Sequence, residues 1–369
     1  MFFSERFQIS SELLKEYGAV DISLVCDIPL FIDPMLIFNS EKEIYKNLHK
    51  SIIRYFHFLY TKAEQGLTMK EVSAWFNFSE VPNNWLGYSL VGNKGLAPGK
   101  EYAKFLYENI AFAINTHGIS KSQHIEKVML LYDGSGKDKI SDLTVNLIKG
   151  FLCEYTENFA LQYLDEKFLE KFPVDKAYFN YETESFVSKE YCLPYVLDEK
   201  GRKEYVLLTP YDILREDEPS INKKDFYESH ERIRSAIEND TLRTYVNNYI
   251  GLAVRQYEEM QRGKRRSIRE RSIRKIEKDA FKELVREYPE LYDYYIRLRE
   301  TDVDKIRSQS LAELNEQIEK LCVASQKIIS LFKNLNYQTN EQLTAREEAK
   351  ARLRFFKHII EDCDGYKNL

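Results

Sequence analysis

The sequence predicts an α+β (or α/β) N-terminal domain over residues 1–235 and an all-α helical-bundle region over residues 236–369. Short apolar runs bounded by Gly, Pro and Asp, which are typical of strands, occur only before the boundary region at residues 225–240. From Asp240 onward, apolar residues recur at helical spacing and no convincing strand is found. A chain of 369 residues is also long enough for two or three domains.

The composition restricts the class of protein. A hydrophobic content of 43% and a charged content of 31% are typical of a soluble globular protein, and the net charge of −5 gives no support for nucleic-acid binding by the chain as a whole. Five widely spaced cysteines without a CxxC pair argue against a disulfide framework or a zinc knuckle. The N-terminus does not resemble a signal peptide, and the most apolar stretch, residues 24–38, is too short to cross a membrane. We therefore expect a cytoplasmic protein with no membrane partner.

The first domain is predicted to mix strands and helices. Val20, Ile22, Leu24, Cys26 and Ile28 alternate with other residues, which indicates a strand that Pro29 and Pro34 then interrupt. Residues 82–100, with four glycines and two prolines, are expected to form an irregular loop. The predicted elements are a strand over 20–33, helices over 41–65, 68–78 and 101–116, a strand over 127–132, a helix over 139–164, and a hairpin of strands 191–197 and 204–209.

The second region is predicted to be helical throughout. Asn239 or Asp240 can cap a helix that runs to about Gly263, and the pattern then gives helices over 267–288, 289–300, 302–336 and from Thr339 onward. Residues 311–335 carry a heptad seam that is apolar at every position except Ser325, and this favours packing along another helix. That helix belongs either to the same bundle or to a partner or second copy. The interface residues would be Leu311, Leu314, Ile318, Leu321, Ile328, Phe332 and Leu335.

The stretch "LLYDGSGKDKISDLTVNLIKG", residues 130–150, has the features of a metal site. Asp133 closes a predicted strand, and Asp138 and Asp142 share one face of the helix that follows. Such carboxylates can hold Mg²⁺ for phosphodiester cleavage. Asp138 or Ser141 can equally cap the helix while the glycines permit a tight turn. The segment is not a phosphate-binding loop, because Leu131 and Asp138 stand where that motif needs Gly and Ser or Thr.

Other catalytic patterns are weak. Asp198-Glu199-Lys200 matches the D/E-x-K element of restriction-type nucleases, but the sequence "DEKG" is better explained as a hairpin turn. The six histidines form neither HxH nor HExxH, and no GxSxG elbow is present. The sequence therefore assigns no catalytic residue and leaves open whether the protein is an enzyme.

The segment "RGKRRSIRERSIRK", residues 262–275, is the clearest candidate for a binding surface. Eight basic side chains against the single acid Glu270 give it a net charge of +7. Such density is typical of a surface that contacts nucleic-acid phosphates, although a solvated helix junction paired with carboxylates elsewhere is the alternative. A second basic stripe is predicted on the last helix. The candidate nucleic-acid-binding residues are Arg262, Lys264, Arg265, Arg266, Arg269, Arg271, Arg274, Lys275, Arg346, Lys350, Arg354 and Lys357.

Four segments together resemble a family. "PLFIDPMLIF" (29–38), "YDGSGKDKISDLTVNLIK" (132–149), "YVLLTPYDIL" (205–214) and "RFFKHIIEDCDGY" (354–366) are similar to segments of poorly characterised bacterial proteins related to restriction and phage-defence nucleases. The resemblance implies that longer members continue into a PD-(D/E)xK nuclease domain with a VDFK…EFK pattern. This sequence has neither element, so no nuclease residue is carried over. Either it is a piece of a longer protein, or this member works without that domain, with a partner.

Three functions remain open from the sequence. The first is a nucleic-acid-associated sensor or regulatory module of a phage-defence or restriction-type nuclease system. The second is a metal-dependent phosphodiesterase that uses the clustered aspartates. The third is a non-enzymatic helical adaptor that assembles a defence complex, as a homo-oligomer or with a protein partner, through the seam at 311–335.

Overall fold

The structure is a computed structural model of the chain. It describes residues 1–25, 27–65, 67–76, 78, 81–87, 104, 107, 130, 137–198, 200–215, 220–263 and 270–302. The chain forms two compact units, Met1–Glu319 and Lys320–Leu369, and every described residue lies in the first. The heptad seam, the second basic stripe and the predicted helices over 302–336 and from Thr339 onward therefore lie essentially outside the described residues.

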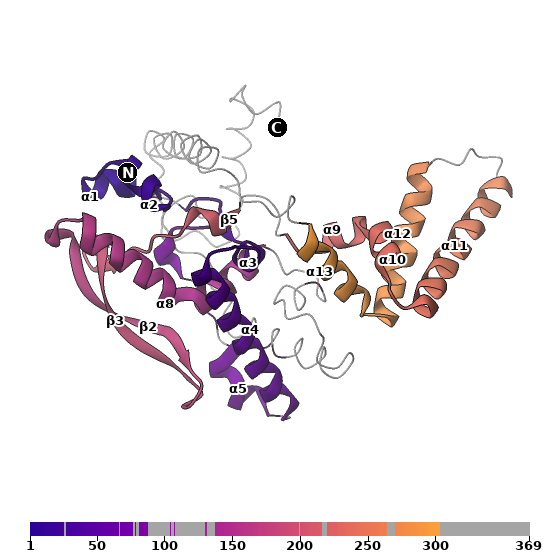
Figure 1. Ribbon diagram of the computed structural model, residues 1–369, viewed down its shortest axis with the longest axis horizontal. Coiled ribbons are helices and arrows are strands. Elements are labelled where there is room, and N and C mark those ends of the chain that lie inside the picture. Colours follow the sequence, from indigo (N-terminus) through magenta and orange to yellow (C-terminus); the bar gives the residue numbers. More distant parts are fainter. Residues whose placement is uncertain are drawn as a thin grey trace, which may run out of the picture. The chain divides into compact units, whose positions relative to one another are not determined.

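The described chain is mixed, with a small antiparallel sheet in the middle of the sequence and helices before and after it (Figure 1). The elements before the sheet are α1 (Phe3–Phe7), α2 (Ser11–Tyr17), β1 (Phe31–Ile32), α3 (Pro34–Phe38), α4 (Glu43–Glu64), α5 (Met69–Phe76) and α8 (Lys137–Tyr163). The sheet consists of β2 (Leu169–Asn180), β3 (Ser185–Leu197) and β4 (Lys203–Tyr205). After it come β5 (Leu214–Arg215), α9 (Lys223–Glu228), α10 (His230–Ala236), α11 (Asp240–Gly263), α12 (Glu270–Glu287) and α13 (Leu291–Thr301). The helices predicted over 41–65, 68–78, 139–164 and 240–263 are confirmed.

The strand predicted over residues 20–33 is largely wrong. Only Phe31 and Ile32 form a strand, β1, which pairs with β5, and the rest of the segment contributes isolated bridges at Ser23 and Ile28. The alternating residues Val20, Ile22, Leu24 and Ile28 are nevertheless all buried. The alternation therefore indicates an extended segment with one buried face. Such a segment can exist without the continuous hydrogen bonding of a β-strand.

Two other predicted segments are only partly described. In the strand predicted over 127–132, the structure describes Leu130 alone, which is helical, so the prediction is wrong at that residue. In the helix predicted over 101–116, it describes Lys104 and Tyr107, and both are helical. The remainder of each segment lies outside the described residues.

The three-stranded sheet is built around a long hairpin that the sequence pattern did not reveal. β2 pairs with β3 from Leu169 opposite Pro194 to Asn180 opposite Ser185, with a bulge between Val174 and Tyr178. The predicted hairpin across "DEKGRK" is confirmed as β3 and β4, although its second strand was predicted too long, because residues 206–209 are not in a strand. Its turn is held by Asp198, whose carboxylate accepts the backbone N–H groups of Lys200 and Arg202 at 2.9 and 2.8 Å. These hydrogen bonds are those of a turn, as predicted.

Residues 221–302 form helices and, among the described residues, no strand. Asn239 caps α11, because its side chain accepts the Leu242 N–H at 3.1 Å. Phe226 lies at the centre of the core of this part, with its ring stacked on Tyr292 at 4.6 Å and tilted against Phe281 at 5.5 Å. The same core includes Met35, Leu36 and Leu130 from the earlier part of the chain. The domain boundary at residue 235 remains a prediction.

Candidate functional site

A groove of about 610 Å³ lies between α4, α8 and the β2–β3 hairpin. Figure 1 shows α8 running along the hairpin and α4 beside it. Its lining is rich in aromatic side chains and contains few charges. The groove-lining residues are Ile44, Asn47, Leu48, Ser51 and Tyr55 of α4; Asn146, Leu147, Ile148, Gly150, Phe151 and Glu154 of α8; and Ala177, Tyr178, Phe179, Tyr181, Phe186, Lys189 and Tyr191 of the hairpin.

The aromatic lining is a connected cluster of rings. Tyr55 packs against Phe179 at 4.9 Å and against Phe186 at 5.6 Å between ring centroids. Phe179 also contacts Phe186 and Tyr181, both at 5.1 Å. At one edge, Tyr178 is 47% exposed. The groove therefore combines a rigid aromatic base with an accessible phenol ring.

The turn of the hairpin is fastened to α4 and α5. Trp75 donates its indole N–H to the Glu184 carbonyl at 2.6 Å, and the Glu184 carboxylate pairs with Lys62 at 2.7 Å. The Arg54 guanidinium lies over the Tyr181 ring, 3.9 Å from its centroid. These contacts join the hairpin to α4 and α5 on either side of the groove.

The side chains that line the groove carry almost no net charge. Glu154 and Lys189 pair with each other at 2.9 Å, and the buried Asn146 amide donates to the Asp142 carbonyl at 2.8 Å. Burial raises the pKa of Tyr191 to about 12 and holds that of Tyr55 well above its usual value, so both phenols are neutral. An apolar, aromatic groove with a few polar groups can hold a planar ligand by stacking.

The predicted metal site is only partly described. Asp142 lies half-buried in α8; for Asp138 the structure describes the backbone, which is in the first turn of α8, and Asp133 lies outside the described residues. Whether the three carboxylates converge on Mg²⁺ therefore stays a prediction. The alternative role of Ser141 as a helix cap is wrong, because α8 begins at Lys137 and the Ser141 hydroxyl accepts the Ile32 N–H at 3.0 Å.

The basic segment joins two antiparallel helices, α11 and α12. Tyr245 packs against Tyr288 at 5.2 Å, and Tyr249 donates to the Glu283 carboxylate at 2.7 Å. The residue numbers of these contacts rise along α11 as they fall along α12, so the two helices are antiparallel. The end of α11 therefore lies close to the start of α12, as Figure 1 shows. The basic segment therefore lies at one end of a helical hairpin.

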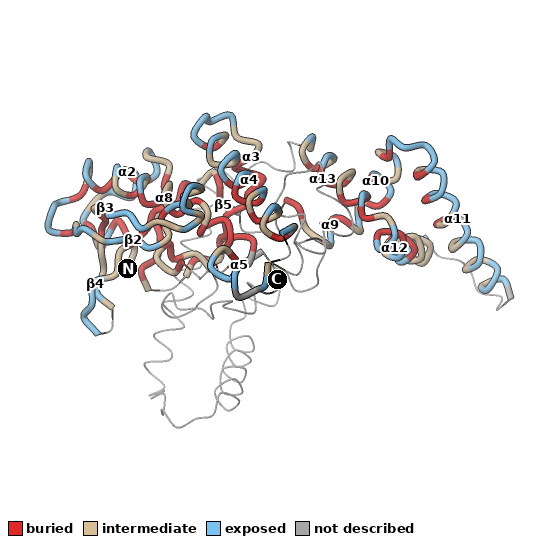
Figure 2. The backbone as a smooth tube through the Cα atoms, turned by 90° about the horizontal axis from the view of Figure 1, so that it is seen from below, coloured by how far each residue is buried: buried red, intermediate tan, exposed pale blue. Residues whose placement is uncertain are grey.

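Four of the predicted phosphate-binding residues are described there. Arg262, Arg271, Arg274 and Lys275 are all exposed, and the second half of α11 is largely exposed in Figure 2. Arg274 pairs with Glu270 at 3.1 Å, whereas no ion pair to the other three is found among the described residues. Lys264, Arg265, Arg266 and Arg269 lie outside the described residues.

Comparison with known proteins places most of the chain in one family. Residues 8–222 match a domain of unknown function, DUF8370. The chain belongs to the DUF8370 family. No curated protein and no solved structure matches it. The DUF8370 segment contains α4, α8 and the β2–β3 hairpin, and hence the whole groove, whereas the α11–α12 hairpin follows it in the chain.

The groove could not be found by searching the sequence for motifs. Its lining comes from three separate segments, none of which has a catalytic or ligand-binding spacing. The available signal was the density of aromatic residues in "FPVDKAYFNYETESFVSKEYCLPY", residues 172–195, of which only 191–195 belong to a predicted strand. Among the described residues, no helix is long and apolar enough to cross a bilayer.

Proposed function

We propose that the chain binds the phosphate backbone of nucleic acid through the basic end of the α11–α12 hairpin. The observation that carries this proposal is the exposure of Arg262, Arg271 and Lys275 at that end, without a carboxylate partner among the described residues. Arginine and lysine in this state are available to replace the counterions of a polyanion.

Neighbouring carboxylates do not neutralise this end of the hairpin. Glu258 and Glu259 precede the basic segment on α11, and Glu270 opens α12. With all three counted, residues 255–275 contain nine basic and three acidic side chains, a net charge of +6 in a chain whose total is −5. A local excess of this size in an acidic protein supports a dedicated anion-binding surface.

The salt dependence of binding tests the proposal. The affinity for a duplex should fall as salt rises, with a log–log slope of about −0.9 for each phosphate neutralised. Replacing Arg262, Arg271 and Lys275 together by Glu should make that slope shallower by about 2.7, since three contacts are lost. Fluorescence anisotropy with labelled duplexes of two unrelated sequences measures both slopes, and both sequences should weaken alike.

A charge-matched variant provides the control. Lys50, Lys167 and Lys171 are exposed on other elements, and replacing these three by Glu changes the total charge by the same amount. The control should keep the wild-type slope. An equal change of slope in both triple variants would show that net charge alone acts, and would contradict binding at the hairpin end.

A second candidate function is stacking of an unpaired base in the aromatic groove. The supporting observation is the exposed Tyr178 ring beside the cluster of Tyr55, Phe179 and Phe186. Aromatic side chains that are accessible next to a rigid apolar base are the usual platform for bases of single strands.

Tyr178→Ala should weaken the binding of an oligothymidine single strand and leave duplex binding unchanged. Loss of one stacked base costs about 1–3 kcal/mol, which corresponds to about a 5- to 150-fold loss of affinity. Tyr245→Ala is the matched control, because Tyr245 is similarly exposed, at 41%, but lies on α11 outside the groove. Equal losses in the two variants, or none in either, would rule out stacking in the groove.

We further propose that nucleic-acid binding serves a sensor or regulatory module of a phage-defence or restriction-type system. The support is the resemblance of the four sequence segments to such proteins. Binding without metal-dependent cleavage is the expected result, and cleavage abolished by Asp142→Ala would favour the phosphodiesterase alternative. A stable oligomer that binds no nucleic acid would favour the adaptor alternative.

A further inference from the structure

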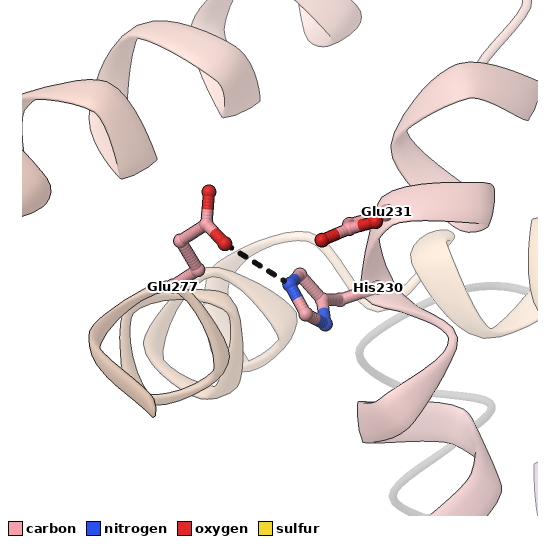
Figure 3. A group of neighbouring side chains, drawn as sticks. All are labelled: His230, Glu231 and Glu277. Atoms are coloured by element: carbon pink, nitrogen blue, oxygen red, sulfur yellow. Dashed lines mark ion pairs between the residues drawn. The ribbon is translucent and has the colours of Figure 1, made fainter. Parts of the chain in front are cut away.

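We propose that His230, Glu231 and Glu277 form a binding site for a divalent transition-metal ion of the zinc type. His230 and Glu231 open α10, and Glu277 faces them from α12, as Figure 3 shows. One potential ligand atom from each side chain lies within 4.8 Å of the others. The site is independent of the aspartates near α8 and does not depend on nucleic-acid binding.

The imidazole of His230 is oriented as a metal ligand requires. Its Nδ1 lies 3.0 Å from the Tyr227 carbonyl oxygen, which can only accept a hydrogen bond, so Nδ1 carries the proton. In the neutral ring, Nε2 then has a free lone pair. This arrangement, with one ring nitrogen donating to a carbonyl and the other facing the ion, is the usual one for histidine ligands.

The Nε2 atom is buried and lacks a hydrogen-bond partner. His230 is 5% exposed, and Nε2 points toward the Glu277 carboxylate, whose Oε2 lies 3.8 Å away. A buried polar atom without a hydrogen bond destabilises the fold, and a metal ion that accepts the Nε2 lone pair would remove this cost. The 3.8 Å gap is too wide for a direct hydrogen bond.

The geometry fits a small cation between the two side chains. Zinc bonds are about 2.0–2.1 Å long to nitrogen and about 2.0–2.2 Å long to oxygen, so one ligand of each kind can be about 4.3 Å apart at most. The distance of 3.8 Å from His230 Nε2 to Glu277 Oε2 lies within that span. Glu231 is exposed, so its side chain can rotate to supply the third ligand. Water or a substrate would complete the coordination.

Arg234 supports the same arrangement. Its Nη1 lies 3.8 Å from Oε1 of Glu277, whereas His230 faces Oε2 of that carboxylate. Each oxygen of Glu277 therefore has its own neighbour, and it is Oε2 that faces His230. One imidazole nitrogen and two carboxylates favour zinc or a similar first-row ion over Mg²⁺ or Ca²⁺, which prefer oxygen ligands alone.

The competing explanation is a direct ion pair between a protonated His230 and Glu277, with Glu231 unused. The two explanations differ in what Glu231→Gln does. In a metal site this substitution removes a ligand, whereas in the ion pair it changes nothing. Because Glu231 is exposed, the variant also avoids any disturbance of the core around His230.

Titration of the metal-free full chain with Zn²⁺ by calorimetry tests the proposal. We expect one ion bound with an affinity that falls at least about tenfold in Glu231→Gln and in Glu277→Gln, since even supporting residues around a metal contribute about 10- to 100-fold. His230→Gln should abolish binding at this site. Circular dichroism of each variant shows whether the fold is intact.

Two controls separate this site from others in the chain. His57→Gln removes an exposed histidine on α4 and should leave the affinity unchanged. With Co²⁺ in place of Zn²⁺, the site should give visible bands without a thiolate-to-cobalt band in the near ultraviolet, because none of its ligands is a cysteine. Wild-type affinity in folded Glu231→Gln, or a thiolate band that accounts for all the bound Co²⁺, would overturn the proposal.

Discussion

Asp33→Ala should lower the free energy of unfolding by about 3–5 kcal/mol, because it leaves the largely buried Arg215 without its carboxylate partner. The Asp33 side chain is fully buried and lies 3.0 Å from the Arg215 guanidinium. Its carboxylate also accepts the Met35 N–H at 3.1 Å, which caps α3, and both the N–H and the hydroxyl of Ser220 at 3.1 and 2.7 Å. The substitution removes all of these interactions at once.

The same carboxylate connects segments that are far apart in the sequence. Ser220, which donates to Asp33, accepts a 2.7 Å hydrogen bond from the buried Arg299 side chain through its carbonyl. Arg299 in turn lies 3.7 Å from Asp225. We therefore expect Asp33→Ala to destabilise the helical part of the chain, residues 221–302, as well as α3.

Urea denaturation monitored by circular dichroism measures this loss. Asp165→Ala is the matched control, because Asp165 also caps a helical turn, Glu166–Phe168, by accepting the Lys167 N–H at 3.1 Å, but it is exposed. The control should lose much less stability than Asp33→Ala. Equal losses would mean that capping, and not the buried network, accounts for the role of Asp33.

Gly150→Ala should destabilise the fold by about 1–3 kcal/mol, although alanine is the better helix former. Gly150 lies in α8 and faces Ala177 in the bulge of β2. A Cβ atom at this position would lie 2.6 Å from the backbone carbonyl oxygen of Ala177, and a backbone atom cannot move aside as a side chain can. The bulge includes Lys176, whose φ of 55° is unusual for a residue with a side chain.

Gly251→Ala is the opposite case in the same fold. Gly251 also lies within a helix, α11, but a Cβ atom there would meet nothing within 4 Å. This substitution should stabilise the protein by about 0.4–1 kcal/mol. Thermal and urea unfolding of the pair should therefore give opposite signs, and stabilisation by both would show that α8 and the β2 bulge separate easily.

Gly150 and Ala177 also line the groove. A shift of the bulge in Gly150→Ala should alter the position of the adjacent Tyr178. Under the stacking proposal, this variant should weaken single-strand binding together with stability, whereas Gly251→Ala should affect neither the groove nor the binding.

The sequence by itself determined the helices that have one apolar face. For α4 and α11, the spacing of apolar residues gave the ends to within about two residues, because helical periodicity and capping are local properties of the chain. Asn239 at the start of α11 and the turn at Asp198 were predictable for the same reason. The charge of the basic segment is also a property of the sequence alone.

Only the tertiary structure decided which side chains meet. The alternation of residues 20–28 correctly indicated a buried face, but whether such a segment forms a ladder depends on the partner beside it, which periodicity does not report. The groove forms only where α4, α8 and the hairpin come together. The strand β2 was not predicted, because Pro173 and several charged residues interrupt the alternation of apolar and polar residues. His230 and Glu277 are brought together by the packing of α10 on the α11–α12 hairpin, since neither lies in a motif with the other. Local sequence determines which face of an element is apolar, whereas long-range packing determines what that face and its neighbours contact.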